Sequence, residues 1–473
     1  MNRIQNLFSN PILYIVLFII AGITFKVQRD YEAKRRHLYV ASAFFISELP
    51  HNKTMVRALA VVEKSLFDPN IQCDLDGRVE PAHVRRMELY IGCKWGVYFI
   101  ECPTLQAPQQ LHLMGDKNLR HEVQITQPDT KPRGFVVCFS RMFNYERWQS
   151  GLAALEFYKF HGVDLMVIPI ISVIQEMFTI LREYEAEGSV RLKRAAMVPN
   201  IEELDYNPNS EVDWFNQVLN FDECLYEYRE SAEFIAFADL DDLMIPQHSL
   251  NLYTEMSQLA AANPHLASFE FNWQWASAIT PSQPEKFSLD GLVKSTNVLF
   301  SAPTCGKPVV RPKRVQEAFI HHPDRWTFRG ELLPGFQHQW FKENTTQVIH
   351  LRHLFEDSDP THPNTTNTLF GNDPRYVDIH NEFESFLRRR PVALEAFHRL
   401  PTKMRYYDAT HKCLQKSQFK RCHSAIICAP EKTDDLPPCV VLETKTKRTS
   451  ISSNWIVHTS ESPQFVQKLN CLI

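Results

Sequence analysis

The amino-acid sequence predicts an α/β fold with a mostly parallel sheet. Between residues 133 and 242, short apolar runs alternate with amphipathic segments of helical length. Two of those segments end at a glycine, where a helix commonly stops. Because parallel strands need crossover connections, this alternation indicates consecutive strand–helix–strand units.

The predicted elements follow one another at short intervals. Each strand is a continuous apolar run, as expected for a sheet buried on both faces. Each helix carries apolar residues at helical spacing. We expect strands at residues 134–140, 164–170, 189–199 and 233–242, and helices at residues 146–162, 172–188 and 211–230.

Composition limits the classes of protein that the chain can belong to. With 473 residues, 44% of them hydrophobic, it is long enough for one large or two medium domains. The formal net charge is −4, without a basic excess, so nucleic acid is not an expected partner.

An apolar segment near the amino terminus predicts a single-pass membrane anchor. Residues 12–25 carry no charge, and Leu7 and Phe8 extend the apolar character to about 19 positions, close to the length that crosses a bilayer. The nearest signal-peptidase-like site, at residues 41–43, lies beyond a basic run, which favours an uncleaved anchor. We assign residues 1–36 to a short cytosolic tail, the anchor and its basic flank.

Two signals disagree about the orientation of this anchor. Five basic residues follow the apolar segment, which by the positive-inside rule would leave the body in the cytosol. Glycosylation sequons at Asn52, Asn344 and Asn364, and 11 cysteines that all follow the segment, favour a lumenal, disulfide-bonded body. A zinc site is the alternative for the cysteines, but the late ones lack paired C-x-x-C spacing. We therefore predict a lumenal body.

The rest of the chain divides into three regions. Residues 37–132 contain extended runs such as "LYVASAFFI" and predict a small β-rich stem region. Residues 133–400 form the main α/β domain. Residues 401–473 are a cysteine-bearing, Lys- and Thr-rich tail for which we expect no regular secondary structure.

Three acids stand at the end of the fourth predicted strand, in "EFIAFADLDDLMIP". Open α/β sheets bind ligands at the carboxyl ends of their strands. Strand alternation places Asp239 and Asp241 on one side, so we expect their carboxylates to converge on a divalent ion. The same alternation turns Asp242 away, where it would cap the next helix. A solvated turn is the commoner explanation of D-x-D, but the apolar flanks favour a buried edge.

Two enzyme classes end an apolar strand with such acids. In haloacid-dehalogenase-like phosphatases the motif is D-x-D-x-T and opens its domain, whereas this chain has Leu243 in place of the threonine and three strand–helix units before the motif. In nucleotide-sugar glycosyltransferases of the A-type fold, D-x-D ends the fourth strand. The position in this chain favours the second class.

Four segments together resemble glycosyltransferase family 92, over about residues 133–400. They occur in the family's order: "VVCFSRMFNYERWQSGLAALEFYKFHGVDLMVI", "NQVLNFDECLYEYRESAEFIAFADLDDLMIP", "GKPVVRPKRV" and "VIHLRHLFE". The chain departs from the family at Asp242, where a glutamate is usual, and at Leu351, where an aromatic residue is usual.

The resemblance implies an A-type, Rossmann-like fold and a type II membrane enzyme of the Golgi or ER lumen. The implied reaction is transfer of a sugar, galactose from UDP-galactose, to a hydroxyl of a glycan or glycoprotein acceptor, with inversion and with Mn²⁺ or Mg²⁺. A degenerate glycan-binding paralogue without catalysis is the alternative. The oligomeric state is not indicated by the sequence.

The candidate site residues combine the motif with the later segments. For the metal they are Asp239, Asp241 and His350; for the donor they are Arg141, Gln217 and Arg352; for catalysis they are Asp241, Asp242 and Glu270. Cys224 and, in part, Gln217 also suit helix packing.

Inversion requires a base near the acceptor hydroxyl, and four carboxylates are open candidates for it. They are Glu270, Asp324, Glu331 and Glu356. Trp273 and Trp275 share one strand face and are either core residues or stacking platforms for an acceptor sugar.

Overall fold

The computed structural model describes residues 36–471 apart from internal gaps. The gaps are residues 50–52, 64–69, 88–91, 117–118, 322–331, 342–344, 357–368, 371–374 and most of 417–435. The predicted anchor and the asparagines of all three sequons lie outside the described residues. In the described part of the chain, no helix has the length and apolar character needed to cross a membrane.

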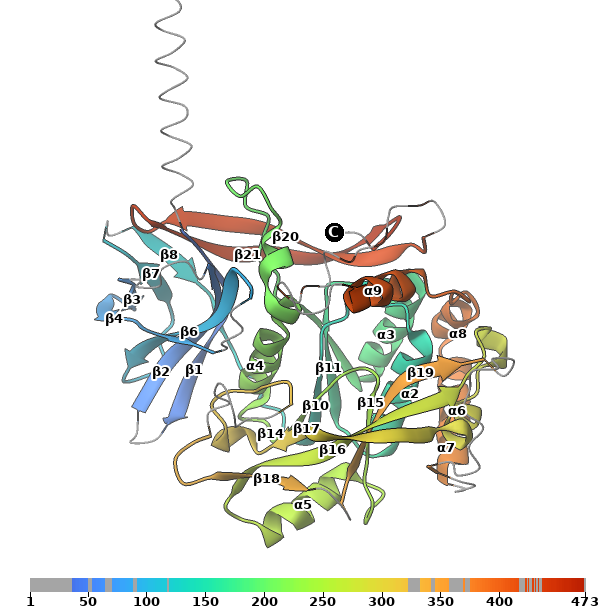
Figure 1. The fold of residues 1–473 in the computed structure, drawn as a ribbon. Coiled ribbons are helices and arrows are strands. Elements are labelled where there is room, and N and C mark those ends of the chain that lie inside the picture. Colours follow the sequence, from blue (N-terminus) through green and yellow to red (C-terminus); the bar gives the residue numbers. More distant parts are fainter. Residues whose placement is uncertain are drawn as a thin grey trace, which may run out of the picture.

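A nine-stranded mixed sheet forms the centre of the main domain (Figure 1). Its order is β13 (Val190–Arg194), β11 (Leu165–Ile170), β10 (Arg133–Phe139), β14 (Ala232–Ala238), β17 (Asn297–Val310), β16 (Leu266–Ile279), β19 (Gln347–Phe355) and β15 (Asp242–Ile245), with β18 (Gln337–Phe341) beside β16.

The first four strands of this sheet are parallel, as predicted. Beyond β14 the sheet is mixed, because β17 pairs antiparallel with both β14 and β16, and β15 pairs antiparallel with β19. Between β16 and β17 stand the 3₁₀ turn Pro284–Lys286 and the short helix α6 (Leu289–Ser295), which do not form a crossover that would make these strands parallel. An α/β fold is therefore present, and the mostly parallel sheet is limited to residues 133–238.

Helices cover both faces of the parallel half. Phe135, Val137 and Phe139 share one core cluster with residues of α2 (Trp148–Phe160) and α3 (Gln175–Glu187). The alternating residues Val136 and Cys138 face the other way, toward α4 (Gln217–Tyr228). Residues of α5 (Leu252–Ala262), α7 (Arg375–Arg389) and α8 (Pro391–His398) join the first cluster.

The predicted helix ends at the two glycines are confirmed. Gly162 and Gly188 take positive φ angles of 74° and 92°, which only glycine adopts without strain. Gly188 directly follows α3 as its left-handed cap.

A second sheet joins the first and last strands of the described part of the chain. Its order is β12 (Ser172–Ile174), β20 (Cys439–Ser450), β21 (Trp455–Lys468), β1 (Arg36–Leu49), β2 (Lys53–Glu63), β6 (Trp95–Thr104) and β5 (His83–Arg86), with β9 (Ile125–Thr126) beside β1. A smaller four-stranded sheet contains β3 (Gln72–Leu75), β4 (Arg78–Pro81), β7 (Leu111–Met114) and β8 (Arg120–Val123).

The prediction of an irregular carboxyl-terminal tail is wrong. Strands β20 and β21 form an antiparallel hairpin, and β21 lies parallel to β1, so the red and blue ends of the chain meet in Figure 1. Buried residues Cys439–Leu442 anchor the start of β20, while its Lys- and Thr-rich remainder is exposed or half-exposed. The composition that suggested disorder is that of the solvent-facing part of a strand.

Helix α4 lies between the two sheets. One side contributes Phe221 and Leu225 to the core of the main sheet, and the other contributes Val218, Leu219 and Tyr226 to a cluster with β1, β2 and β6. The stem region and the main domain therefore share a core through α4.

Five disulfides join ten of the eleven cysteines. They are Cys73–Cys102, Cys93–Cys422, Cys138–Cys224, Cys413–Cys428 and Cys439–Cys471; the side chain of Cys305 lies outside the described residues. The packing interpretation of Cys224 is incomplete, because its sulfur bonds to Cys138 and ties α4 to β10. These ten cysteines leave no thiolates for the zinc alternative.

Candidate active site

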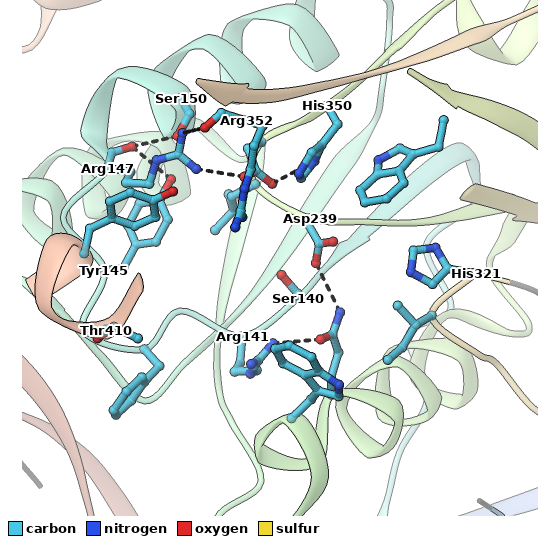
Figure 2. A pocket seen from close by; sticks show the side chains of 18 of the residues that line it. Ser140, Arg141, Tyr145, Arg147, Ser150, Asp239, His321, His350, Arg352 and Thr410 are labelled. Atoms are coloured by element: carbon cyan, nitrogen blue, oxygen red, sulfur yellow. Dashed lines mark hydrogen bonds and ion pairs between the residues drawn. The ribbon is translucent and has the colours of Figure 1, made fainter. Parts of the chain in front are cut away.

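A cavity of about 550 Å³ opens at the carboxyl ends of β10 and β14 (Figure 2). Residues that follow these strands line it, together with residues from the starts of α2 and α4, from β16 and β19, and from α9 (Arg405–Lys416). The lining includes Ser140, Arg141, Tyr145, Arg147, Gln217, Asp239, Asp241, Trp273, Trp275, His321, His350, Arg352, Tyr407 and Thr410.

The acidic motif forms a turn and does not continue the strand. Strand β14 ends at Ala238, and the backbone N–H of Asp242 donates to the carbonyl of Asp239 at 3.0 Å. Strand alternation therefore stops before the first acid, and each carboxylate has partners of its own. Strand alternation is therefore not what positions Asp239 and Asp241, although both line the cavity.

Asp239 is held on the α4 side of the cavity. Its carboxylate accepts from Lys307 Nζ at 2.7 Å and from Gln217 Nε2 at 3.1 Å. Gln217 in turn accepts from Arg141 Nη1 at 2.8 Å. Burial lowers the pKa of Arg141 to about 10 in spite of the nearby Asp239 charge, so the guanidinium stays protonated at neutral pH and contributes positive charge.

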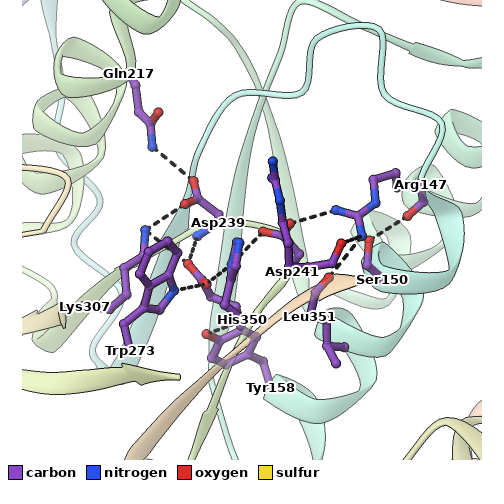
Figure 3. A network of polar contacts seen from close by, with 12 residues as sticks. Arg147, Ser150, Tyr158, Gln217, Asp239, Asp241, Trp273, Lys307, His350 and Leu351 are labelled. Atoms are coloured by element: carbon purple, nitrogen blue, oxygen red, sulfur yellow. Dashed lines mark hydrogen bonds and ion pairs between the residues drawn. The ribbon is translucent and has the colours of Figure 1, made fainter. Parts of the chain in front are cut away.

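Asp242 contacts Lys307, Trp273 and His350, three of the residues labelled in Figure 3. It is fully buried, and its carboxylate contacts His350 Nδ1 and Trp273 Nε1 at 2.8 Å each and Lys307 Nζ at 3.1 Å. It also accepts from the backbone N–H of Asp239 at 2.9 Å. The prediction that Asp242 turns away to cap a helix is wrong, because the turn directs its side chain back under the motif.

The charges in this network stabilise one another. Burial alone would raise the pKa of Asp242, but the Lys307 ammonium, followed by His350 and Trp273, outweighs burial and holds that pKa well below its ordinary value. Burial alone would lower the pKa of Lys307, yet Asp239 and Asp242 raise it. Lys307 therefore stays a cation although no part of it is exposed.

Asp241 belongs to a second ion pair, with Arg147. Arg147 Nη1 lies 2.8 Å from its carboxylate, while Nη2 donates to the carbonyls of Leu351 and Arg352 at 3.0 and 3.2 Å. The backbone N–H of Leu351 donates to the carbonyl of Asp241 at 2.7 Å. Arg147 thereby fixes Asp241 against strand β19, where Asp242 pairs with His350.

Three of these groups are suited to a divalent ion. Asp241, Asp242 and His350 offer ligand atoms that all lie within 4.8 Å of one another. Asp241 and His350 line the cavity, while Asp242 lies behind them and bonds to Nδ1 of His350. A carboxylate on one ring nitrogen is the usual support for a histidine that binds metal through the other, so the donor set fits. Asp239, one of the predicted ligands, is not in this group.

Comparison with known proteins decides the family. The sequence profile of Glycosyltransferase family 92 matches residues 133–406, more than half of the chain. The chain belongs to glycosyltransferase family 92.

Individual relatives from Caenorhabditis elegans are distant. The chain is 28% identical to glycosyltransferase family 92 protein F13G3.3 over 284 residues, which cover 59% of this chain and 54% of the relative. It is 24% identical to family 92 protein C33H5.2 over 401 residues, or 80% of this chain and 77% of the relative. The chain thus spans about half the length of the first relative.

One solved structure also shows local likeness. TarS of S. aureus (residues 1–349) is 13% identical, with a TM-score of 0.20 over 38% of this chain and 47% of that chain. At that TM-score the likeness carries no argument about the fold.

The predicted donor-binding residues and the two tryptophans of this family 92 chain lie at the cavity. Arg141, Gln217 and Arg352 line the cavity, as do Trp273 and Trp275, which are half-buried and not enclosed in the core.

The candidate bases are placed differently. Glu270 does not line the cavity; it is buried, and its carboxylate lies 2.9 Å from His338 Nε2. Glu356 lines a neighbouring cavity. Asp324 and Glu331 lie outside the described residues. Among the described residues that line the main cavity, the carboxylates are Asp239 and Asp241.

Two cations of the site were not singled out from the sequence. Lys307 belongs to the segment "GKPVV" and Arg147 to "NYERW", both part of the family resemblance. A lysine within an apolar strand is rarely buried without an acidic partner, so Lys307 could have been paired with the motif. For Arg147 no sequence signal distinguishes an ion pair from an ordinary helix start.

Proposed function

We propose that this family 92 chain is an active, metal-dependent glycosyltransferase that transfers galactose from UDP-galactose to a glycan hydroxyl with inversion. The observation that carries the proposal is the pairing of Asp241 with His350 at the wall of a cavity that also contains Arg141 and Arg352. A diphosphate needs cationic partners, and this cavity provides them on both sides of the acids.

We expect different residues of the chain to bind different parts of the donor. Asp241 and His350, with Asp242 behind them, would hold Mn²⁺ or Mg²⁺, and the ion would supply positive charge to the leaving diphosphate. Arg141 and Gln217 line the side where α4 begins, which suits the nucleotide. Arg352 lies on β19 two residues from His350 and suits a phosphate oxygen.

The aromatic wall supports a sugar substrate. Trp273 and Trp275 both line the cavity, with ring centroids 4.4 and 5.5 Å from that of His350. Indole faces stack on the apolar faces of sugars, so these rings suit the transferred sugar or the acceptor.

We further propose that the body is lumenal and held by the predicted anchor. Five disulfides support an oxidising compartment, since they are rare in the cytosol. Endoglycosidase treatment of the protein from eukaryotic cells is then expected to lower its apparent mass. An unchanged mass together with reduced thiols would contradict this topology.

A donor screen tests the proposed reaction. Purified protein is incubated with several UDP-sugars, Mn²⁺ and a glycan mixture, and UDP release is measured with and without the glycans. We expect glycan-dependent release with UDP-galactose and a product of inverted anomeric configuration by NMR. Binding of glycans without any UDP release would favour the degenerate paralogue, and a phosphoenzyme lost in Asp239→Asn would favour a phosphatase.

A further inference from the structure

A second cavity of about 440 Å³ adjoins the candidate active site. The two cavities share Arg147, Arg352 and Tyr407, so they meet at the ion pair that fixes Asp241. Arg141 and Gln217, which suit the nucleotide, do not line the second cavity; in Figure 2, Arg147 and Arg352 lie toward the top of the view and Arg141 lies below Asp239. The second cavity thus extends the site away from the end that suits the nucleotide.

The lining of this cavity is rich in positive charge. Arg352, Lys403 and Arg405 line it along with Arg147, against the acids Glu356 and Asp408. Within the part of the chain that the structure describes, neither Arg352 nor Lys403 forms an ion pair; the Arg352 guanidinium lies 5.7 Å from the ring centroid of Trp275. Arg352 also lines the candidate active site, where it suits a donor phosphate, so Lys403 is the cation of this lining that is left for a second anion.

The positive charge of this lining affects the pKa values of two histidines in it. Burial, and then the charges of Arg352 and Arg147, lower the pKa of both His353 and His411. Both imidazoles therefore take up a proton less readily than an ordinary histidine. The surroundings thus repel a further cation and favour an anion.

Aromatic rings add a surface suited to a sugar. Tyr407 and Phe355 line the cavity, and Tyr407 stacks on His411 with ring centroids 5.5 Å apart and an interplanar angle of 14°. The N-terminus of α9 is already occupied, because the backbone N–H of Tyr407 donates to Glu146 at 2.7 Å. The anion site would thus be built from side chains and not from a helix end.

We propose that this second cavity is the acceptor subsite and that it selects an acidic glycan, with a carboxylate or sulfate on a sugar unit beyond the accepting hydroxyl. The distance from the candidate metal site to the far end of the second cavity can be judged along strand β19. Glu356 follows His350 by six residues, which is roughly 20 Å along an extended chain. That length accommodates several sugar units. The inference rests on the proposed transferase function and adds the class of acceptor.

Calorimetric titration of the full protein with three probes tests the inference. The probes are a uronic-acid-containing tetrasaccharide, its carboxyl-reduced neutral counterpart and sodium sulfate. We expect the acidic tetrasaccharide to bind at least roughly tenfold more tightly than the neutral one, with an advantage that shrinks as salt increases. Lys403→Gln is expected to weaken acidic binding about threefold or more. Lys412 is an exposed lysine of α9 outside the cavity lining. Lys412→Gln removes the same charge and is expected to leave the affinity for the acidic tetrasaccharide unchanged.

The outcomes separate this inference from the function on which it rests. Equal affinity for the acidic and neutral tetrasaccharides, in protein that still releases UDP from a UDP-sugar, would overturn the inference alone. Equal loss in Lys403→Gln and Lys412→Gln would do the same. Sulfate that binds as tightly as the acidic tetrasaccharide and displaces it would identify a site for free anions and overturn the acceptor assignment. Failure of the proposed function would instead appear as absence of UDP-sugar binding and turnover.

Discussion

Lys307 bridges two carboxylates of the motif, Asp242 in the interior and Asp239 at the cavity wall. Its ammonium lies 2.7 Å from Asp239 and 3.1 Å from Asp242, and neither Lys307 nor Asp242 is exposed. An ionised pair at this depth is costly to break, because the remaining charge stays buried without a partner.

Replacement of Lys307 by methionine is expected to destabilise the fold by about 3–5 kcal/mol, the usual cost of breaking a buried pair. Urea unfolding measures the change. Lys313→Met is the matched control, since Lys313 lies in the same "GKPVVRPKRV" segment but pairs with Glu230 at the surface. The double variant Lys307→Met with Asp242→Asn is expected to cost less than the sum of the two single changes. Additive costs would show that the pair is not coupled.

Asp242 is expected to matter more for stability than Asp241. An asparagine at 242 would present an amide to donors from Lys307, Trp273 and His350, so Asp242→Asn should cost about 3 kcal/mol. Asp241 is partly exposed at the cavity wall, and Asp241→Asn should cost about 1 kcal/mol. Thermal unfolding of the two variants compares them. The reverse order of stability would contradict the network.

At the scale of residues, the sequence indicated where the site lies but not how its charges pair. Asp239, Asp241 and His350 were predicted as ligands because acids at a strand end and a histidine in a family segment point to metal chemistry, and the structure groups Asp241 and His350 with Asp242. Asp242 was misplaced because the alternation of a strand was extended through a turn. The partners of these acids come from the start of α2 and from α4, β16, β17 and β19, and no local pattern encodes such pairing.

Helix α9 closes one side of the cavity and is tied to α2 by Glu146. The carboxylate of Glu146 is buried at the N-terminus of α9, where it accepts from the backbone N–H of Tyr407 at 2.7 Å. Burial raises the pKa of Glu146 to about 8, although the backbone N–H groups of α9 oppose the rise. Glu146 therefore holds a proton in the folded chain at pH values where the unfolded chain has released it.

This difference makes stability depend on pH with a defined sign. Between pH 4.5, the ordinary pKa of a glutamate, and about 8, the folded state binds more protons, so stability falls as the pH rises. The contribution has a slope of at most about 1.4 kcal/mol per pH unit. Glu146→Gln is expected to remove it in urea unfolding series from pH 5 to 8. The exposed Glu395→Gln, on α8, is expected to keep the slope of the parent. An unchanged slope in Glu146→Gln would contradict a buried proton at this contact.

At the scale of elements, periodicity predicted the parallel half of the main sheet well. The continuous apolar runs of β10, β11 and β14 and the glycine ends of α2 and α3 are local signals. The antiparallel half was not foreseen, because β16 and β17 are long strands whose partners depend on contacts across the whole domain. Composition misled the prediction for β20, where lysines and threonines on an exposed strand resemble a disordered tail.

The two ends of the chain make the molecule one folding unit. Strand β1 pairs with β21 over Arg36–Val40 and Trp455–Thr459, and α4 packs its outer side on the sheet that they complete. The family match, by contrast, stops at residue 406. The end of the family match at residue 406 is therefore not an end of the folded core.

A fragment of residues 133–406 is expected to lack a cooperative unfolding transition. Without β1, β2 and β6 it would expose Val218, Leu219 and Tyr226 of α4 to water. Four of the five disulfides would also be absent, because both cysteines of each lie outside the fragment. Differential scanning calorimetry of the fragment and of residues 36–473 makes the comparison. A fragment that melts in one transition at the same temperature as the longer chain would refute the shared core.

Metal-dependent donor binding at Asp241 tests the central claim most directly. Calorimetric titration with UDP-galactose, with and without Mn²⁺, would be run on the parent, on Asp241→Asn and on the control Asp290→Asn, a half-buried acid outside the cavity lining that pairs with Lys294. The account predicts that Mn²⁺ tightens donor binding in the parent and in the control, and that Asp241→Asn loses roughly 30-fold or more of that gain, about 2 kcal/mol. Equal enhancement by Mn²⁺ in Asp241→Asn and in the parent would contradict it.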